Sequence, residues 1–235
     1  MGSSKARAEL EALEREVIEC RKCPRLVAWR EEVARVKRAS FRDETYWGRP
    51  IPGFGDPDAR IVILGLAPAA HGGNRTGRIF TGDRSGDFLF AGLHRAGLAN
   101  QALSVALDDG LRLIDTWMLA AVRCAPPANK PTPAERDTCL PWAEREMALL
   151  GGVRVVLCLG SFAWAAAFRL RGTVPKPRPK FGHGALVEGA PWAVLGCFHP
   201  SQQNTFTGKL TPAMMDDVFE RAKVLAAGPD GVGTA

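Results

Sequence analysis

The sequence has no long hydrophobic run and few cysteines, and each absence excludes a class of protein. No apolar stretch reaches the roughly 18–20 residues that cross a bilayer, so a membrane protein is excluded. Residues 1–19 mix charged residues with Leu and Ala and lack the apolar core of a secretory signal. Six cysteines in 235 residues are too few for a disulfide scaffold. We therefore expect a soluble cytoplasmic protein.

The signatures of nucleotide-dependent and magnesium-dependent enzymes are also missing. The glycine-rich segment 65–83 contains neither the Gly-Lys-Ser/Thr ending of a P-loop nor a GxGxxG dinucleotide motif. No group of carboxylates follows the predicted strands to hold Mg²⁺. We therefore expect no nucleotide cofactor and no catalytic metal.

What is present is the composition of an ordinary globular domain. Apolar residues make up 46% of the chain and charged residues 24%. The formal net charge of +6 favours a polyanionic partner, but only weakly. We predict a single domain over residues 1–227, with a helical N-terminal part at 4–38 and a disordered tail at 228–235.

Short apolar runs that end in turn residues alternate with helical patterns. Such runs are typical of strands buried on both faces of a parallel sheet, and they lie at residues 61–64, 114–122, 153–159 and 192–198. Helices are predicted around residues 4–18, 25–38, 88–93, 132–150, 161–169 and 211–225. This order predicts an α/β fold in three layers, α/β/α. Ligands of such sheets bind outside the carboxyl ends of the strands, so segments that follow different strands should meet in one cleft.

Four cysteines are candidate metal ligands. Cys20 and Cys23 form a C-x2-C flanked by basic residues, whereas Cys124 follows a predicted strand and Cys139 lies in the next helix. Two such pairs can supply four thiolates to zinc or to an iron–sulfur cluster, and the spacing does not distinguish the two. Two further cysteines lie inside apolar strands and are expected in the core.

Three long motifs carry a resemblance to a known family. The segments are GLAPAAHGGNRTGRIFTGD at 65–83, RCAPPANKPTP at 123–133 and FHPSQQNTFTGKLT at 198–211. Together they resemble the family 5 (type B) uracil-DNA glycosylases. The resemblance implies the uracil-DNA glycosylase fold, a sandwich around a short, mostly parallel sheet. It also implies a structural four-iron, four-sulfur cluster on Cys20, Cys23, Cys124 and Cys139, which resolves the choice between zinc and iron.

The same resemblance implies a pocket for a base flipped out of DNA. Phe80 would stack on that base, with Gly65, Leu66 and Ala67 lining the pocket through their backbone. His199 would donate a hydrogen bond to the uracil O2 as charge builds on the leaving base.

Three further residues are candidates for the pocket. Asn129 can read the pyrimidine edge or position water, although Asn before Lys-Pro is also typical of a turn. His71 is a second possible pocket residue. Many relatives place a polar residue at the position of Ala67, so another group must act here. Asp83 is our candidate to activate water or stabilise the sugar cation, with Asp87 less favoured; capping of a helix is the alternative role of Asp83.

The expected partner is DNA that contains uracil or other deaminated bases such as hypoxanthine, bound by a monomer at the nucleoid. A basic, proline-rich stretch that ends at Lys180 is predicted to meet phosphates, as are loop arginines such as Arg75. Ser201, Gln203 and Phe206 are predicted to approach the duplex, and Gln203 or Phe206 would fill the space left by the base. The alternative function is a non-catalytic iron–sulfur or zinc protein that binds nucleic acid.

Overall fold

The computed structural model describes residues 2–228 and contains one mixed sheet. The six strands lie in the order β1-β3-β2-β4-β6-β5. The four central strands are parallel, and the two edge strands run antiparallel to their neighbours. The strands are β1 (Phe54–Gly55), β2 (Ile61–Gly65), β3 (Thr116–Ala120), β4 (Val155–Leu159), β5 (Leu186–Val187) and β6 (Ala193–Cys197).

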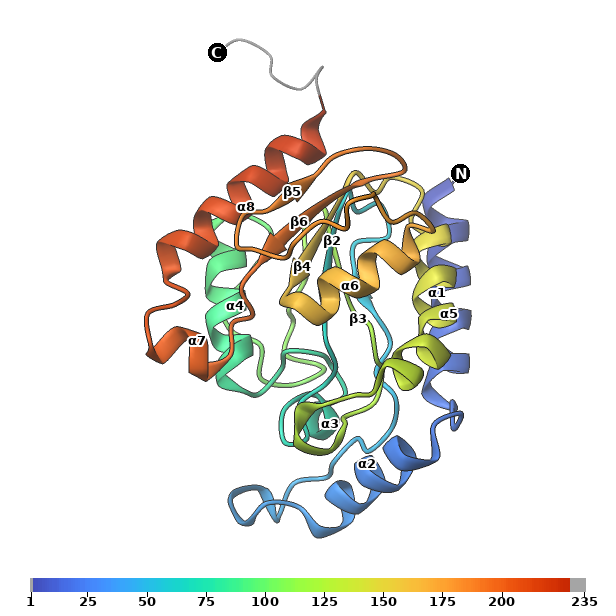
Figure 1. The fold of residues 1–235 in the computed structure, drawn as a ribbon. Coiled ribbons are helices and arrows are strands. Elements are labelled where there is room, and N and C mark those ends of the chain that lie inside the picture. The colour runs from blue at the N-terminus through green and yellow to red at the C-terminus, as the bar shows by residue number, and fades with distance from the viewer. Residues whose placement is uncertain (1, 229–235) are drawn as a thin grey trace.

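Helices cover both faces of this sheet (Figure 1). The α-helices are α1 (Gly2–Ile18), α2 (Pro24–Val36), α3 (Gly73–Thr76), α4 (Arg84–Arg95), α5 (Pro133–Leu149), α6 (Ser161–Leu170), α7 (Gln202–Phe206) and α8 (Pro212–Ala227). Two short 3₁₀ turns, η1 (Ala39–Phe41) and η2 (Pro127–Asn129), complete the secondary structure of the described residues.

The sheet is the middle layer of a three-layer sandwich, as the sequence predicts. Helices α4 and α8 pack on one face, and α1, α5 and α6 lie on the other (Figure 1). Strand β2 is buried on both sides: Ile61 and Ile63 join the core under α4 and α8, whereas Val62 and Leu64 join the core under α5 and α6. The expected α/β class and mostly parallel sheet are therefore confirmed.

The first residues of three helices carry the sequence signals that are typical of a helix start. Pro24 is the first residue of α2, where its missing N–H is not needed. Thr132 and Glu135 form the predicted capping box of α5, with Pro133 in the first turn. Thr211 caps α8 by accepting a hydrogen bond from the backbone N–H of Met214.

The two edge strands were not predicted. Strand β1 interrupts a segment rich in Pro and Gly that is expected to be an irregular loop, and Phe54 in it pairs with Met118 of β3. Both edge strands are two residues long and partly exposed, so neither carries a detectable hydrophobic pattern. Most of the predicted disordered tail, residues 229–235, lies outside the described residues.

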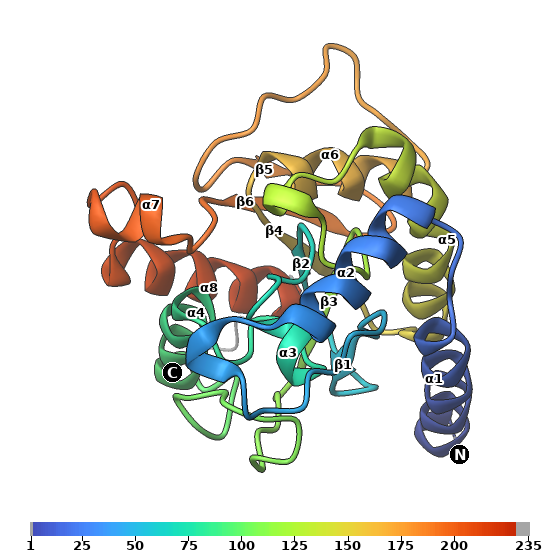
Figure 2. The same cartoon turned by 90° about the horizontal axis from the view of Figure 1, so that it is seen from below.

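The carboxyl ends of the parallel strands define the functional edge of the molecule. The segments that follow β2 and β3 leave the sheet at this edge. In the view from below, α2 and α3 lie across the same edge (Figure 2). In the described part of the chain, no helix has the length and apolar character needed to cross a bilayer.

Candidate active site

A cavity at the carboxyl edge of the sheet brings together segments that follow three different strands. Its volume is about 390 Å³. Residues after β2, β3 and β6 contribute to it, together with the start of α7. The lining consists of Leu66, Ala67, Ala69, Ile79, Phe80, Asp83, Ser85, Asn129, His199, Ser201 and Gln203. Most of the residues predicted to bind or act on the base therefore share one enclosure.

Phe80 forms one wall of this cavity through an unusual backbone conformation. Its φ of 54° lies in the left-handed region, which costs a non-glycine residue energy and is concentrated at functional sites. Gly65, the last residue of β2, lies behind the ring: a Cβ atom there would come within 3.0 Å of it. The ring centroid of Phe80 is 5.8 Å from that of His199. The absence of a side chain at Gly65 thus allows the Phe80 ring to lie close to the end of β2.

His199 lies two residues after the end of β6 and lines the cavity beside Phe80. The amide of Asn204 donates to the His199 carbonyl at 2.8 Å and holds the turn into α7. Burial lowers the pKa of His199 to about 4, so the ring is neutral at physiological pH. A neutral imidazole retains one N–H donor, which it can direct at a ligand oxygen.

Asp83 caps a helix, which was the alternative role considered for it, and its side chain also borders the cavity. As the N-cap residue of α4, its Oδ1 accepts a hydrogen bond from the backbone N–H of Gly86 at 3.0 Å. The same side chain lines the cavity. Burial raises the pKa of the Asp83 carboxyl above its ordinary value, while backbone hydrogen bonds from Gly86 and Ser85 oppose the rise. The cap holds one oxygen and fixes the direction of the other.

The second oxygen of Asp83 lies against a residue with no side chain. A Cβ atom at Gly72 would come within 2.1 Å of Asp83 Oδ2, closer than non-bonded atoms can approach. Gly72 therefore provides the space in which this carboxylate is held.

Asn129 lies at the mouth of the cavity. It is exposed, and its φ of 55° follows a φ of 52° at Ala128, so two successive non-glycine residues are left-handed. The backbone N–H of Asn129 donates to the Pro126 carbonyl at 3.2 Å and closes this turn. The turn predicted as an alternative is thus present, and it directs Asn129 toward the site.

Five predicted residues are not part of the lining of this cavity: His71, Arg75, Lys180, Phe206, and Gly65, which lies behind Phe80. His71 lines an adjoining hollow, where its Nδ1 is 3.0 Å from the Tyr46 hydroxyl. Arg75 has a side chain only 10% exposed and donates to the carbonyls of His71 and Gly82. It also donates a hydrogen bond to the Glu44 carboxylate, so its guanidinium hydrogen-bonds to groups within this protein. Lys180 is exposed on the long segment between α6 and β5, which projects from the body of the molecule (Figure 2).

The adjoining hollow contains residues that the sequence did not single out. It has a volume of about 460 Å³ and shares Asp83 and Asn129 with the main cavity. Arg38, Phe41 and Arg84 also line it. Arg84 could have been identified as a site residue from the sequence because it follows Asp83 directly. Arg38 is far from the motifs in the sequence, so no such signal identified it.

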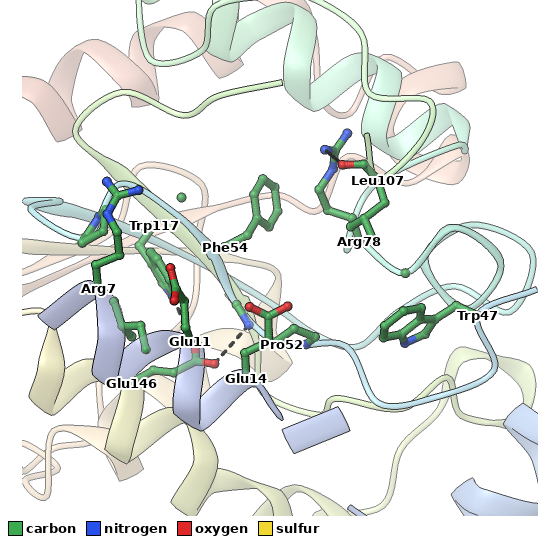
Figure 3. A pocket seen from close by; sticks show the side chains of 15 residues that line it. Arg7, Glu11, Glu14, Trp47, Pro52, Phe54, Arg78, Leu107, Trp117 and Glu146 are labelled. Carbon is green, nitrogen blue, oxygen red and sulfur yellow. Dashed lines mark hydrogen bonds between the residues drawn. The ribbon is translucent and has the colours of Figure 1, made fainter. Parts of the chain in front are cut away.

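A third cavity, of about 230 Å³, lies between α1, α5 and the β1 edge (Figure 3). None of the predicted site residues lines it. Its buried carboxylate, Glu146, already accepts hydrogen bonds from Gly53 N at 3.0 Å and from the Arg123 guanidinium at 2.8 Å. This charge is therefore used to join β1 to α5.

The four candidate cysteine ligands lie in one region between the N-terminal helices and the sheet. Cys20 packs against the apolar group that contains Cys139, and Cys23 packs against the group that contains Cys124. Burial raises the pKa of Cys124 to about 11 and that of Cys139 to about 12, and the neighbouring cysteines add to both shifts. No group of three or more metal-binding side chains among residues 2–228 is close enough to hold a metal ion.

The chemistry around these four thiols is compatible with an iron–sulfur cluster. A cluster places its own iron and sulfur atoms between the ligands, so its cysteines lie farther apart than those around one ion. Donors that stabilise thiolates are already in place: the backbone N–H of Arg123 points to Cys139 Sγ at 3.3 Å, and the Arg30 guanidinium points to Cys124 Sγ at 2.9 Å.

Comparison with known proteins decides the family. The model of the uracil DNA glycosylase superfamily matches residues 52–223, which include all of the cavity lining. The chain belongs to this superfamily. It is 58% identical over 227 residues to a type-5 uracil-DNA glycosylase of Mycobacterium bovis, covering 96% of this chain and 84% of that protein.

Two more relatives show where in the superfamily the chain belongs. A type-5 uracil-DNA glycosylase of Thermus thermophilus is 53% identical over 92% of this chain and 98% of its own length. A type-4 uracil-DNA glycosylase of Archaeoglobus fulgidus is 29% identical over 68% of this chain and 64% of its own length. The resemblance to the type-5 family seen in the three motifs is thus confirmed across nearly the whole chain.

Proposed function

We propose that this protein removes uracil from DNA by hydrolysing the N-glycosidic bond. The observation that carries the proposal is the cavity that an aromatic ring, a neutral histidine and a half-buried carboxylate line together. Phe80 supplies the stacking surface, His199 the donor and Asp83 the negative charge. A flipped nucleotide needs all three while its bond to the sugar breaks.

The reaction separates charge, and the two sides of the cavity match that separation. As the bond from C1′ to the base breaks, its electron pair leaves with the base, which becomes anionic, and the sugar becomes cationic. His199 donates a hydrogen bond to the base oxygen, and Asp83 stabilises the sugar or orients water. Water then adds hydroxide to C1′, and its proton neutralises the base. The products are free uracil and an abasic site.

We also propose that Cys20, Cys23, Cys124 and Cys139 hold a four-iron, four-sulfur cluster. Their placement between α2, the segment after β3 and α5 supports a structural role. The cluster would join the N-terminal helices to the sheet, and the cysteines take no part in the reaction.

DNA binding is assigned to the surface around the cavity mouth. Arg38 and Arg84 border the adjoining hollow and form no salt bridge within the described residues, although the Arg84 guanidinium lies over the Phe206 ring, 5.5 Å from its centroid. Both guanidinium groups can therefore pair with phosphates. We propose that the protein acts as a monomer on cytoplasmic, nucleoid DNA, since one chain supplies the complete lining. The small side chain of Ala67 also supports acceptance of larger deaminated bases such as hypoxanthine.

Incubation of the purified protein with a duplex that contains one uracil tests the function. Alkali should then cleave the strand at the resulting abasic site, and the cleavage should persist in EDTA. A duplex with thymine at the same position is the control. Binding without strand cleavage would support the alternative, a non-catalytic nucleic-acid-binding protein.

Gly72→Ala should reduce the single-turnover excision rate about 10- to 100-fold, because a Cβ atom there displaces the carboxylate of Asp83. Gly151→Ala is the matched control, since a Cβ atom at Gly151 meets nothing within 4 Å. Rates should be measured with enzyme in excess, alongside thermal unfolding. Equal excision rates for the two variants would show that the position of the Asp83 carboxylate does not affect the reaction.

Phe206→Ala should slow excision from duplex DNA by about tenfold while excision from single-stranded DNA stays unchanged. Phe206 is 68% exposed at the end of α7, an exposure typical of a side chain that enters the base stack, whereas Gln203 lines the cavity. The ratio of duplex to single-strand rates is the measurement. If Gln203→Ala changes this ratio and Phe206→Ala does not, Gln203 is the wedge.

A further inference from the structure

Arg30 is a buried cation beside the cysteines. It lies in α2, seven positions after Cys23, and its side chain is 2% exposed. Its Nη1 donates to Cys124 Sγ at 2.9 Å and its Nη2 to the carbonyl of Cys20 at 3.2 Å. Its Nε is buried and has no hydrogen-bond partner within residues 2–228.

No buried carboxylate neutralises this guanidinium. The acidic group closest to it in the described chain is Glu31, whose Oε1 is 3.9 Å away and whose side chain is 44% exposed. Both oxygens of Glu31 are hydrogen-bonded to Arg21 at the surface. A guanidinium does not lose its proton in a protein, and an unpaired buried charge costs several kcal/mol. A neutral thiol is too weak an acceptor to offset this cost.

A second buried arginine in the same region shows the contrast. Arg123 is 1% exposed, and its guanidinium pairs with Glu146 at 2.8 Å, whose side chain is 3% exposed. The carboxylate of Glu146 therefore balances Arg123, whereas Arg30 has only sulfur and carbonyl acceptors. The side-chain acceptor that the Arg30 guanidinium faces is Cys124 Sγ.

We infer that Arg30 is the charge partner of the cysteine-ligated cluster and acts through the sulfur of Cys124. This inference rests on the proposed cofactor. Four thiolates bring negative charge into a site that otherwise contains an unbalanced cation. The hydrogen bond to Sγ withdraws electron density from the sulfur and so weakens the covalency of its bond to iron, while the positive charge lowers the energy of the anionic site. The helix that supplies the ligand Cys23 thus also supplies the balancing charge.

The test compares three variants of the holoprotein. Arg30→Met removes the charge and the donors, and Arg30→Lys keeps the charge. Arg35→Met is the matched control on the same helix, because Arg35 is 72% exposed and pairs only with Glu32. Iron release to a ferrous chelator is followed by loss of visible absorbance, and resonance Raman spectra report the Fe–S(Cys) stretches. Circular dichroism checks the fold.

Arg30→Met should release iron about 10- to 100-fold faster than the wild type, with at least one Fe–S(Cys) stretch at higher frequency. The iron-release rate of Arg30→Lys should lie between the rates of the wild type and Arg30→Met. Arg35→Met should release iron at the wild-type rate. If Arg30→Met yields no folded holoprotein, cluster retention by Arg30→Lys still supports the inference. Wild-type release rates and unshifted stretches in Arg30→Met would overturn it, as would a Lys variant no better than Met. A wild-type protein without iron and sulfide would instead refute the cofactor.

Discussion

Replacing His199 with Ala should lower the single-turnover rate of uracil excision by about 100-fold or more, with little change in DNA affinity. The donor acts on charge that develops only as the glycosidic bond breaks, so its loss affects the transition state rather than binding. Burial of His199 lowers the local polarity, which strengthens a hydrogen bond to an anionic oxygen. Rates measured with enzyme in excess, together with affinity for an uncleavable uracil analogue in DNA, separate the two effects.

The pH dependence gives an independent check on His199. Because burial lowers its pKa to about 4, the ring becomes charged only below that pH and is neutral above it. The excision rate should therefore show no inflection near pH 6.5, where an ordinary histidine titrates. His94→Ala is the control, since His94 is exposed on α4 and bonds to the Ala99 carbonyl. A His199→Ala variant as fast as His94→Ala would remove His199 from the mechanism.

Replacing Asp83 with Asn should reduce the excision rate by about tenfold or more, equivalent to roughly 1.4 kcal/mol of barrier. Asn is nearly as good an N-cap as Asp, so the hydrogen bond to Gly86 N and the start of α4 should survive. The substitution thus removes the negative charge and leaves the geometry in place. Unchanged thermal stability with a slower rate would separate the chemical role from the capping role.

The pKa of Asp83 also predicts the acid limb of the rate profile. Burial raises this pKa, so the carboxylate takes up its proton at a higher pH than an exposed aspartate does. The rate should fall as the pH drops through that raised value, and Asp83→Asn should lose this dependence. Asp87→Asn is the matched control, one turn further along α4 and exposed. If Asp87→Asn slows the reaction and Asp83→Asn does not, the two assignments must be exchanged.

Much of the site could be located from the chain alone because it follows a simple rule of topology. Phe80, Asn129 and His199 each come after a different apolar run, and parallel strands end at one edge of a sheet. The long motifs then assigned chemistry to these positions. For Arg75, which is predicted to meet phosphates, the position in the motif does not reveal that the side chain turns inward and donates hydrogen bonds to its own loop.

The backbone conformations at the site could not be predicted from the local sequence pattern. Left-handed backbone at Phe80 and Ala128 contradicts the intrinsic preference of these residues and is maintained by surrounding contacts. Gly72 and Gly65 belong to a run of many glycines, and only the packed structure shows which of them touch Asp83 and Phe80. The adjoining hollow with Arg38 and Arg84 also depends on helices that are distant in sequence.

The sequence by itself determined the class of fold, the family, the edge of the sheet that carries the site, and which of six cysteines lie together. The fold class follows from the periodicity of apolar residues and the edge from the rule that parallel strands end together, whereas the family and the set of four cysteines follow from the resemblance of the three motifs. Only the tertiary structure decided that Asp83 is both cap and cavity wall, that Arg75 donates hydrogen bonds to its own loop, and that Arg30 faces Cys124 with no buried carboxylate beside it among the described residues. Burial and charge balance arise from residues brought together by folding, so they become visible only in three dimensions.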